Sequence, residues 1–589
     1  MCKKIDRYFP YEEFRVGQRE FMEALCNSLI GEGLSVIEAP NGIGKTSGIL
    51  ATLSYLANEH GLSFLYFVRT HRQIDRVMEE CKRIPDLRVV AMRGKGELCK
   101  NEQVKRLGSY VLVNAKCNLL RETGKCDLYN ITNKEGTSSH PTRCYDPITD
   151  YRGSGCPYYD TLKTIRKSKC HVIVLSYNYL LNPEIGEEFL NGLLKRDLSI
   201  VVDEAHNLKR YWLNRYIKRV ELDLLDCSLG SRVSELCHTI CDLVSSFKRS
   251  KLDFLMIPKE YIKSRLIKCL DSPKFIADLQ DVGCLLRELI ADIDRSRFVL
   301  LEEGKMLLAL ENVLKFEELI ERYRSVSLIS GTWGGKYAVN MEFSKKLNFI
   351  EISLQNWGIT KVFITEDFTT RYVERGKSEY YRLATVLADV SNYVIGNIGI
   401  FTASYEILSG MISVGFEHLV NKPVFIESRD SNAWENRILV EKFKRSASNG
   451  AILLGVQGGK NSEGEDFPGL QMTTSIVVGL QLPRPGLESS LFRMYWAEMY
   501  GPSKLDVLYS SRAAFQAAAR PVRGPKDIGF IVFADKRFLN REIIRMMPKW
   551  MRHKVEPVSL EELPDRAREF FNEIRHSYQG APNGTSNYR

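Results

Sequence analysis

The residues with the clearest chemistry form a short loop near the N-terminus, Ser-Val-Ile-Glu-Ala-Pro-Asn-Gly-Ile-Gly-Lys-Thr over residues 35–46. Its valine and isoleucine favour a strand, its glycines permit the positive φ angles of a tight turn, and residues 47–58 favour a helix. Such a turn directs backbone N–H groups and a helix N-terminus at one small volume, which suits a polyphosphate. The loop therefore predicts a nucleotide site in which Lys45 neutralises the β- and γ-phosphates and the Thr46 hydroxyl binds Mg²⁺.

One position of this loop departs from the strict P-loop pattern, because Ala39 stands where the first glycine is usual. The relaxed pattern stays specific, since strand, loop and helix follow in the required order. Upstream, Arg15 and Gln18 have helical spacing, and the sequence leaves open whether they contact a nucleotide base or cap the loop. The set predicted to bind the nucleotide and Mg²⁺ in this region is Gln18, Ala39, Pro40, Asn41, Gly42, Ile43, Gly44, Lys45 and Thr46.

An acidic pair, Asp203 and Glu204, directly follows the apolar run 199–202. Downstream of a phosphate loop, such a pair has the chemistry that nucleotide hydrolysis needs. Asp203 is expected to hold Mg²⁺ through its water shell, and Glu204 to orient and deprotonate the attacking water. An acidic helix cap is the structural alternative.

A second group of polar residues lies far downstream, where Gln516, Arg520 and Arg523 are spaced at adjacent helical turns. Pro521 indicates that the helix begins or breaks nearby. Two fixed guanidinium groups facing a γ-phosphate stabilise the charge of the transition state, as arginine fingers do. We therefore expect these residues to complete the nucleotide site.

The 14 cysteines are unevenly distributed, with six of them between Cys99 and Cys170. In an intracellular protein such a cluster favours a metal site over a disulfide framework. The segment lacks the paired Cys-x-x-Cys knuckles of a zinc ribbon, and widely spaced thiolates better suit an iron–sulfur cluster. Spacing alone excludes neither zinc nor a set of unrelated buried thiols. The five candidates are Cys99, Cys117, Cys126, Cys144 and Cys156.

Apolar runs that alternate with helical periodicity predict the elements that position these groups. Strands at 35–38, 64–68, 172–175 and 199–202 indicate a parallel α/β unit, which the cysteine segment interrupts. Arg69 and Thr70 follow one of these strands, where doubly wound sheets bind ligands, so they either contact a nucleic-acid backbone or belong to a solvated loop. Helical periodicity then dominates residues 209–310 and predicts a second, all-helical insertion. A second α/β unit is expected from about Val362, with strands at 399–402, 451–454, 475–480 and 529–533.

Length and composition set the broad class. The 589 residues, 44% of them hydrophobic, can bury several cores and predict three or four domains. No apolar run approaches the roughly 20 residues of a membrane span, and residues 1–10 lack the apolar core of a signal peptide, so we expect a soluble, cytoplasmic protein. The net charge of +10 suits a polyanionic partner such as nucleic acid. The glycine-, asparagine- and serine-rich tail 580–589 is expected to be disordered.

Taken in order, the phosphate loop, Asp203-Glu-Ala-His206, Ser330-Gly-Thr332 and the Gln516/Arg520/Arg523 group resemble a superfamily 2 helicase. More narrowly, the chain resembles the archaeal XPD (xeroderma pigmentosum group D) helicases over about residues 8–555. The stretches that carry this narrower resemblance are Phe9-Pro-Tyr11, Gly96-Glu-Leu-Cys99, Cys156-Pro-Tyr-Tyr159, Leu175-Ser-Tyr-Asn-Tyr-Leu-Leu181, Asp203-Glu-Ala-His-Asn207, Ser462-Glu-Gly-Glu-Asp-Phe467 and Val532-Phe-Ala-Asp-Lys-Arg-Phe538.

The resemblance implies an ATP-dependent 5′→3′ DNA helicase that acts in DNA repair, translocates on single-stranded DNA and unwinds forked duplexes as a monomer. It implies two RecA-like P-loop motor domains, with an iron–sulfur domain and an α-helical Arch domain inserted in the first. Motor 1 is then expected at 1–98, 157–208 and 311–355, the cluster domain at 99–156, the Arch domain at 209–310 and motor 2 at 356–579. The cofactors implied are ATP, Mg²⁺ and a [4Fe–4S] cluster.

The family's functional residues carry over to matching positions of this chain. Catalysis is assigned to Lys45, Asp203, Glu204, Arg520 and Arg523, and Gln516 joins the ATP site. Among the cysteines, Cys126 is preferred over Cys144 as the third cluster ligand, because Cys126-Asp-Leu-Tyr129 resembles the family's third site. The cluster ligands are thus Cys99, Cys117, Cys126 and Cys156, with Cys144 as runner-up. DNA contacts are assigned to Arg69, Thr70, Tyr177, Thr332, Thr402 and Ser462.

One departure from the family lies at Ala519, where helicases usually have a glycine before the first arginine. A methyl group there is a small change and does not imply loss of activity. The competing hypotheses are a nucleic-acid-binding scaffold whose motor is silent, an RNA-directed helicase, and an iron–sulfur helicase of the DinG or FANCJ type. ATPase assays with and without single-stranded DNA separate the first, and unwinding of DNA against RNA duplexes separates the others.

Overall fold

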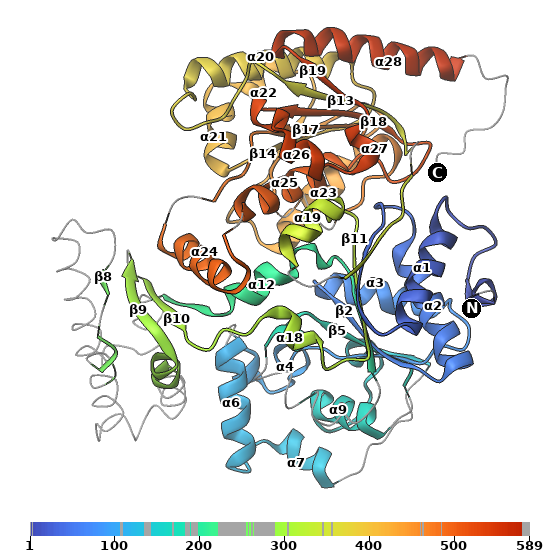
Figure 1. Ribbon diagram of the computed structural model, residues 1–589, viewed down its shortest axis with the longest axis vertical. Helices are drawn as coiled ribbons and strands as arrows, with labels where there is room; N and C mark the ends of the chain where they lie inside the picture. Colours follow the sequence, from blue (N-terminus) through green and yellow to red (C-terminus); the bar gives the residue numbers. More distant parts are fainter. Residues whose placement is uncertain are drawn as a thin grey trace.

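A computed structural model describes most of the chain (Figure 1). The larger ranges outside the description are 107–109, 135–142 and 580–589. Also outside it are 183–197, apart from residue 189, and 222–288, apart from residues 255–256, 258–260 and 263. Shorter gaps fall at 1, 3, 168–169, 303–304, 344–346, 355–356, 460, 462–464, 484–485 and 503. The predicted disordered tail and the expected helical run at 233–244 therefore lie outside the described residues.

The first motor is built on an eight-stranded sheet in which every described strand pair is parallel, in the order β12-β1-β11-β6-β2-β5-β3-β4. The central strands read as continuous apolar runs because both faces are buried. Helices α1 (Gln18–Ile30), α2 (Lys45–His60) and α3 (His71–Cys81) pack on this sheet. The strands are β1 (Gly33–Glu38), β2 (Ser63–Val68), β3 (Val89–Ala91), β4 (Cys144–Tyr145), β5 (Val172–Ser176), β6 (Leu198–Val202), β11 (Ser325–Ser330) and β12 (Asn348–Glu351).

The second motor repeats this architecture with a seven-stranded parallel sheet in the order β15-β16-β14-β17-β18-β13-β19. Helices α20 (Lys377–Tyr393) and α28 (Leu563–Gln579) lie side by side on one face (Figure 1). The two RecA-like motors expected from the sequence are thus present. The strands are β13 (Ile359–Thr365), β14 (Ile398–Thr402), β15 (Val424–Ile426), β16 (Ile452–Val456), β17 (Thr474–Val478), β18 (Ile528–Ala534) and β19 (Val555–Val558).

The cysteine-rich segment forms a small helical unit below the first sheet, visible as α6 (Tyr110–Glu122), α7 (Asp127–Lys134) and α9 (Pro157–Lys167) in Figure 1. It does not include all of residues 99–156. Strand β4 pairs in parallel with β3, so Cys144 and Tyr145 belong to the edge of the motor sheet. Their apolar, buried side chains extend that sheet by one strand, which the expected boundary did not anticipate.

The second insertion is not helical throughout among its described residues, which corrects the expectation for 209–310. Its base is an antiparallel sheet in the order β7-β10-β9-β8, formed by β7 (Ile217–Glu221), β8 (Leu255–Met256), β9 (Ser296–Glu302) and β10 (Lys305–Leu310). Strands β9 and β10 pair in antiparallel, and each carries a short apolar run, at 298–301 and 306–310, that periodicity alone does not distinguish from a buried helix.

Helix α24 (Leu487–Tyr500) of the second motor packs beside α12 (Leu208–Asn214) and the base of this insertion (Figure 1). Ion pairs join Arg219 to Glu488, and Arg297 to Glu498 at 2.7 Å. Lys209 is buried beneath this contact, 2.6 Å from Glu317 and 3.9 Å from the Tyr500 ring centroid. The second motor therefore contacts the inserted sheet directly.

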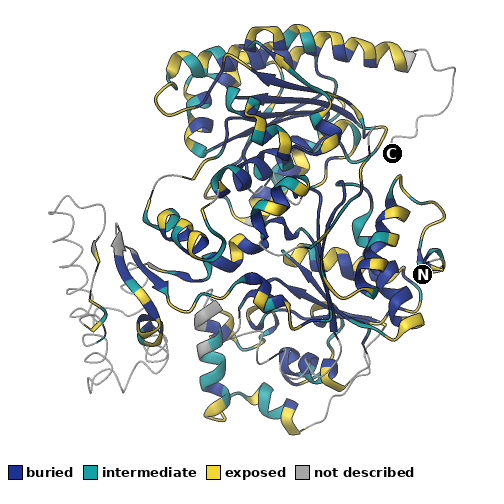
Figure 2. Ribbon diagram, in the orientation of Figure 1, coloured by how far each residue is buried: buried dark blue, intermediate teal, exposed yellow. Residues whose placement is uncertain are grey.

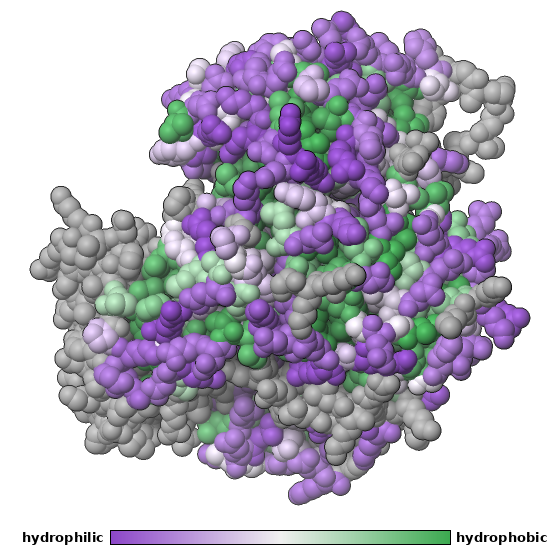
Figure 3. Space-filling view, viewed as in Figure 1, coloured by the Kyte–Doolittle hydropathy of each residue, from purple (hydrophilic) through white to green (hydrophobic). Residues whose placement is uncertain are grey.

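Figure 2 shows the strands of both sheets buried and the outer helices exposed along one side. On the face shown in Figure 3, hydrophilic side chains cover most of the second motor, and hydrophobic ones appear in patches near the middle of the molecule. Cys2 and Cys26 form a disulfide that links the N-terminal segment to α1, a pairing that the sequence did not predict. Among the described helices, none is both long and apolar enough to cross a bilayer.

Candidate active site between the two motors

The phosphate loop begins where β1 ends at Glu38 and closes where α2 begins at Lys45. Gly42 and Gly44 have φ angles of +87° and +84°, a left-handed conformation that favours glycine. A Cβ at Gly42 would lie 1.8 Å from the backbone oxygen of Arg523. The loop thus has the predicted conformation, and the second motor approaches it closely.

Arg15 and Gln18 hold this loop from the side. The Arg15 guanidinium donates to the Gly42 carbonyl at 2.8 Å, and the Gln18 amide donates to the Gly44 carbonyl at 3.0 Å and to Ser47 Oγ at 3.1 Å. Arg15 precedes α1 rather than sharing a helical face with Gln18, because Gly17 at φ +76° turns the chain between them. In this state both residues cap the loop.

The two carboxylates lie opposite Lys45. The Lys45 ammonium donates to Asn41 Oδ1 at 2.7 Å and lies 3.7 Å from Glu204 Oε1. Burial and, after it, the neighbouring charge of Glu204 together raise the pKa of Asp203 to about 6. Burial also opposes ionisation of Glu204, but the positive charges of Lys45, Arg523 and Arg69 hold its pKa below the usual value. Glu204 is therefore charged, as a water-orienting base must be.

His206 connects the carboxylate pair Asp203 and Glu204 to the second motor, a role that was not predicted from the sequence. Its Nδ1 lies 2.8 Å from Ser330 Oγ, and its Nε2 lies 2.7 Å from the Gln516 amide nitrogen. Gln516 also donates to Thr332 Oγ1 at 3.1 Å. Burial lowers the pKa of His206 to about 3, so the ring is neutral and can accept one of these hydrogen bonds. The sequence signal that could have identified this role is the place of His206 in the Asp-Glu-Ala-His motif.

The two arginines lie beyond the end of helix α25 (Leu505–Ala518) rather than on it, since the chain leaves the helix just before Pro521. Arg520 donates to the backbone oxygen of Glu465, and Arg523 Nε lies 3.1 Å from Asp466. Both side chains line a cleft of about 940 Å³ between the motors. The opposite wall of this cleft includes Asn41, Glu204 and His206.

The donor set in this cleft fits a nucleotide with Mg²⁺. Glu204, which is charged and lies 3.7 Å from Lys45, lines the cleft, and Gln516 Oε1 is buried without a hydrogen-bond partner among the described residues. An unpaired buried polar atom requires a partner, and a bound ligand can supply one. The cleft thus brings together four of the predicted residues, Glu204, Gln516, Arg520 and Arg523, with Lys45 beside Glu204.

The residues predicted to contact DNA are placed differently from one another. Arg69 and Thr70 follow β2 and line the cleft, and their contact with DNA stays a prediction. Thr332 and Thr402 are buried, with the Thr402 hydroxyl hydrogen-bonded to the Ser404 and Gly455 carbonyls. Tyr177 is also buried, and its hydroxyl donates to the Asp203 backbone oxygen. These three side chains support the site from inside the motors. Ser462 lies outside the described residues.

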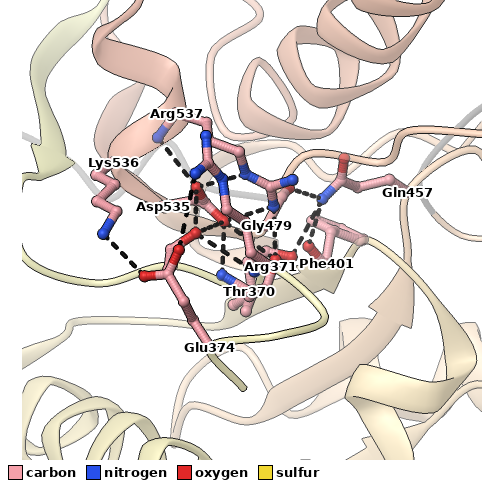
Figure 4. A network of polar contacts seen from close by, with 11 residues as sticks. Thr370, Arg371, Glu374, Phe401, Gln457, Gly479, Asp535, Lys536 and Arg537 are labelled. Atoms are coloured by element: carbon pink, nitrogen blue, oxygen red, sulfur yellow. Dashed lines mark hydrogen bonds and ion pairs between the residues drawn. The ribbon is translucent and has the colours of Figure 1, made fainter.

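A polar network anchors the carboxyl edge of the second sheet (Figure 4). Asp535, fully buried after β18, accepts hydrogen bonds from the backbone N–H of Thr370 at 2.8 Å and from the Arg537 guanidinium at 2.7 Å. Nearby, the Gln457 amide donates to the carbonyls of Phe401 and Gly479. Burial opposes ionisation of Asp535, but the hydrogen bonds from Arg537 hold its pKa below the usual value.

Replacing Asp535 with asparagine is expected to lower the free energy of unfolding by about 3 kcal/mol at neutral pH, because it leaves Arg537 without its buried partner. A carboxyl whose pKa is depressed on folding stabilises the protein above its unfolded pKa of about 3.9, and that stability is lost as the pH falls through the folded value. Denaturant unfolding at pH 7 and near pH 3 measures the difference. Equal destabilisation at both pH values would show that packing, and not charge, is responsible.

Four of the cysteines gather in the helical unit and one does not. Cys99 and Cys126 pack against the same apolar cluster, formed by Val104, Val113 and Leu120. Burial raises the pKa of Cys99, and the nearby Cys117 and Cys126 raise it further. Burial likewise raises the pKa of Cys156 to about 11, with Cys117 and Cys99 close by.

The remaining candidate, Cys144, lies on β4 and hydrogen-bonds to Cys81 of the motor. Within the described part of the chain, no three potential ligand side chains converge closely enough to hold one metal ion. A cubane cluster places four irons between its thiolates, so its ligands stand farther apart than those of a single ion. The assignment of Cys99, Cys117, Cys126 and Cys156 as cluster ligands stays a prediction.

Comparisons with known proteins agree with this arrangement. The family model DEAD_2 matches residues 66–223, and the helicase C-terminal domain matches residues 387–554. The general transcription and DNA repair factor IIH helicase subunit XPD of Dictyostelium discoideum is 24% identical over 95% of this chain and 90% of its own length. The ATP-dependent DNA helicase chl-1 of Caenorhabditis elegans is 23% identical over 87% of this chain and 77% of its own.

A solved structure titled XPD_Helicase superposes with a TM-score of 0.69 at 19% identity and covers 93% of this chain and 100% of its own. A structure of Xpd4 from S. tokodaii superposes with a TM-score of 0.60 at 16% identity and covers 92% of this chain and 100% of its own length. At these identities the likeness establishes the fold, in which two motors enclose one cleft.

Proposed function

We propose that this chain is an XPD/Rad3-type superfamily 2 helicase that hydrolyses ATP to translocate 5′→3′ on single-stranded DNA and to unwind duplex DNA. The observation that carries the proposal is the cleft in which Glu204 of one motor, 3.7 Å from Lys45, faces Arg520 and Arg523 of the other. A site shared by two motors links hydrolysis to their relative movement.

The chain's own residues account for the chemistry. The loop amides and Lys45 bind the β- and γ-phosphates, with Thr46 and Asp203 placed to hold Mg²⁺, which would neutralise developing charge. Glu204 orients the attacking water and accepts its proton. Arg520 and Arg523 leave their contacts with Glu465 and Asp466 to stabilise the transferred phosphoryl group. Gln516 and His206 couple the state of the nucleotide to both sides of the cleft through their hydrogen bonds with Thr332 and Ser330.

We propose that Cys99, Cys117, Cys126 and Cys156 hold a [4Fe–4S] cluster, which would tie the helices of this unit together. The cluster unit and the second insertion would act as the wedge that parts forked DNA. The proposed domain limits remain those expected from the sequence, except that 144–145 joins motor 1. DNA repair is the proposed process, because the XPD relatives are named as subunits of a transcription and DNA repair factor. A monomer suffices, since the described cleft is built within one chain.

Strand displacement with matched substrates tests the proposal. Duplex DNA with a 5′ single-stranded overhang should be unwound in the presence of ATP, whereas duplexes with a 3′ overhang, or RNA duplexes with a 5′ overhang, should be displaced far more slowly. Preference for the 3′ overhang would overturn the direction, and preference for RNA would identify an RNA-directed helicase. Hydrolysis without displacement of any substrate would indicate a translocase or a scaffold.

A further inference from the structure

A second cavity of about 660 Å³ lies where the first motor meets the inserted β-sheet. Its floor is the carboxyl ends of β2 and β5, and its walls are α12, β7 and the end of β10. Arg69 and Thr70 line both this cavity and the cleft between the motors. The two sites therefore share two neighbouring residues.

The lining of this cavity is cationic. It carries four basic side chains against the single carboxylate of Glu311. Lys218 and Arg295 share the carboxylate of Asp292, at 2.6 Å each, so two positive charges remain in excess after both carboxylates are counted. Such a lining attracts a polyanion. The four basic residues are Arg69, Arg215, Lys218 and Arg295.

Aromatic rings are placed among these charges. Tyr211 of α12 is 37% exposed, and the Arg69 guanidinium lies 5.7 Å from the centroid of its ring. The buried Tyr177 supports it edge-on, with ring centroids 6.5 Å apart at an interplanar angle of 61°. An exposed ring that a buried ring and a guanidinium hold in place is a preorganised stacking surface for a planar ligand.

We infer that this cavity binds a segment of single-stranded nucleic acid, with Tyr211 stacking on one base and Lys218 contacting a neighbouring phosphate. Cations alone would suit any polyanion, but cations interleaved with an exposed, supported tyrosine match the alternating phosphates and bases of a single strand. The inference rests on the proposed function and assigns it a strand-contacting residue outside the motor motifs.

The cavity also has a route to the hydrolytic site. The Tyr177 hydroxyl donates to the backbone oxygen of Asp203, while its ring supports Tyr211. A base stacked on Tyr211 would therefore contact a ring that Tyr177 supports, and Tyr177 also positions Asp203. Tyr177 is thus a positioning residue, and Tyr177→Phe should lower the maximal DNA-stimulated rate of ATP hydrolysis more than it raises the DNA concentration for half-maximal stimulation.

Equilibrium binding of a fluorescein-labelled oligodeoxythymidylate and of an abasic strand of equal length tests the stacking role. Tyr211→Ala should weaken oligodeoxythymidylate binding roughly tenfold or more and change abasic binding little, whereas Tyr211→Phe should bind as the wild type does. Tyr381→Ala removes a comparably exposed tyrosine from α20 and should leave both affinities unchanged. A folded Tyr211→Ala protein that binds both strands like the wild type would overturn the inference.

A second variant keeps the test decisive if Tyr211→Ala does not fold. Lys218→Gln should reduce the slope of log affinity against log salt by about 0.7, the value for one phosphate contact on a single strand. An unchanged slope would remove Lys218 from the strand path and contradict the inference. Failure of the wild-type protein to bind oligodeoxythymidylate at all would instead overturn the proposed function, which separates the two failures.

Discussion

Replacing Lys45 with alanine is expected to reduce ATP hydrolysis by at least roughly 100-fold, because the loop then lacks the one ammonium that faces the β- and γ-phosphates. In the structure this ammonium lies between Asn41 and Glu204, so its loss also removes a charge that keeps Glu204 ionised. Phosphate release in the presence of single-stranded DNA measures the effect.

Glu204→Gln provides the matched control for this variant. It should hydrolyse as poorly as Lys45→Ala but still bind ATP, because the amide cannot accept the proton of the attacking water while the phosphate loop stays intact. Binding of a fluorescent ATP analogue distinguishes the two. Hydrolysis at the wild-type rate by Lys45→Ala would refute the assignment of the phosphate loop.

Replacing Cys126 with serine is expected to abolish the visible absorption of the purified protein and to lower its iron content from about four per chain to near zero. The same substitution at Cys144 should leave both unchanged, because that thiol lies on β4 beside Cys81 and away from the other four. The pair is well matched, since both are cysteines of the same segment. Iron and sulfide analysis measures the loss of the cluster, and absorption spectra measure the loss of its visible bands.

The reverse outcome, with iron lost only in Cys144→Ser, would contradict the proposed ligand set. Zinc in place of iron in the wild-type protein would contradict the cluster itself. If the cluster supports the wedge, Cys126→Ser should unwind duplex DNA poorly while it retains much of its DNA-stimulated ATP hydrolysis.

The sequence was sufficient for the parts of the fold that depend on local pattern. The strand and loop of residues 33–44 and the strand before Asp203 follow from apolar runs and glycine positions, and the structure has both. The choice of Cys126 over Cys144 needed the family's spacing, because five thiols offered equal chemistry. In the structure Cys144 lies in the edge strand of the motor sheet, and the choice between the two ligands stays a prediction.

What the sequence missed depends on contacts between distant segments. His206 meets Gln516 across 310 positions, and Arg512 of the second motor reaches the Trp333 carbonyl and Glu342 of the first. Local periodicity carries no information about such pairs. The antiparallel base of the second insertion was missed for a related reason, since its strands come from segments about 80 residues apart that flank a helical pattern.

Coupling between nucleotide hydrolysis in the cleft and a bound strand of DNA is measured by the steady-state rate of ATP hydrolysis with and without single-stranded DNA. The rate should rise several-fold and saturate as single-stranded DNA is added, and duplex DNA without overhangs should stimulate it far less. Equal rates with and without single-stranded DNA would contradict this coupling.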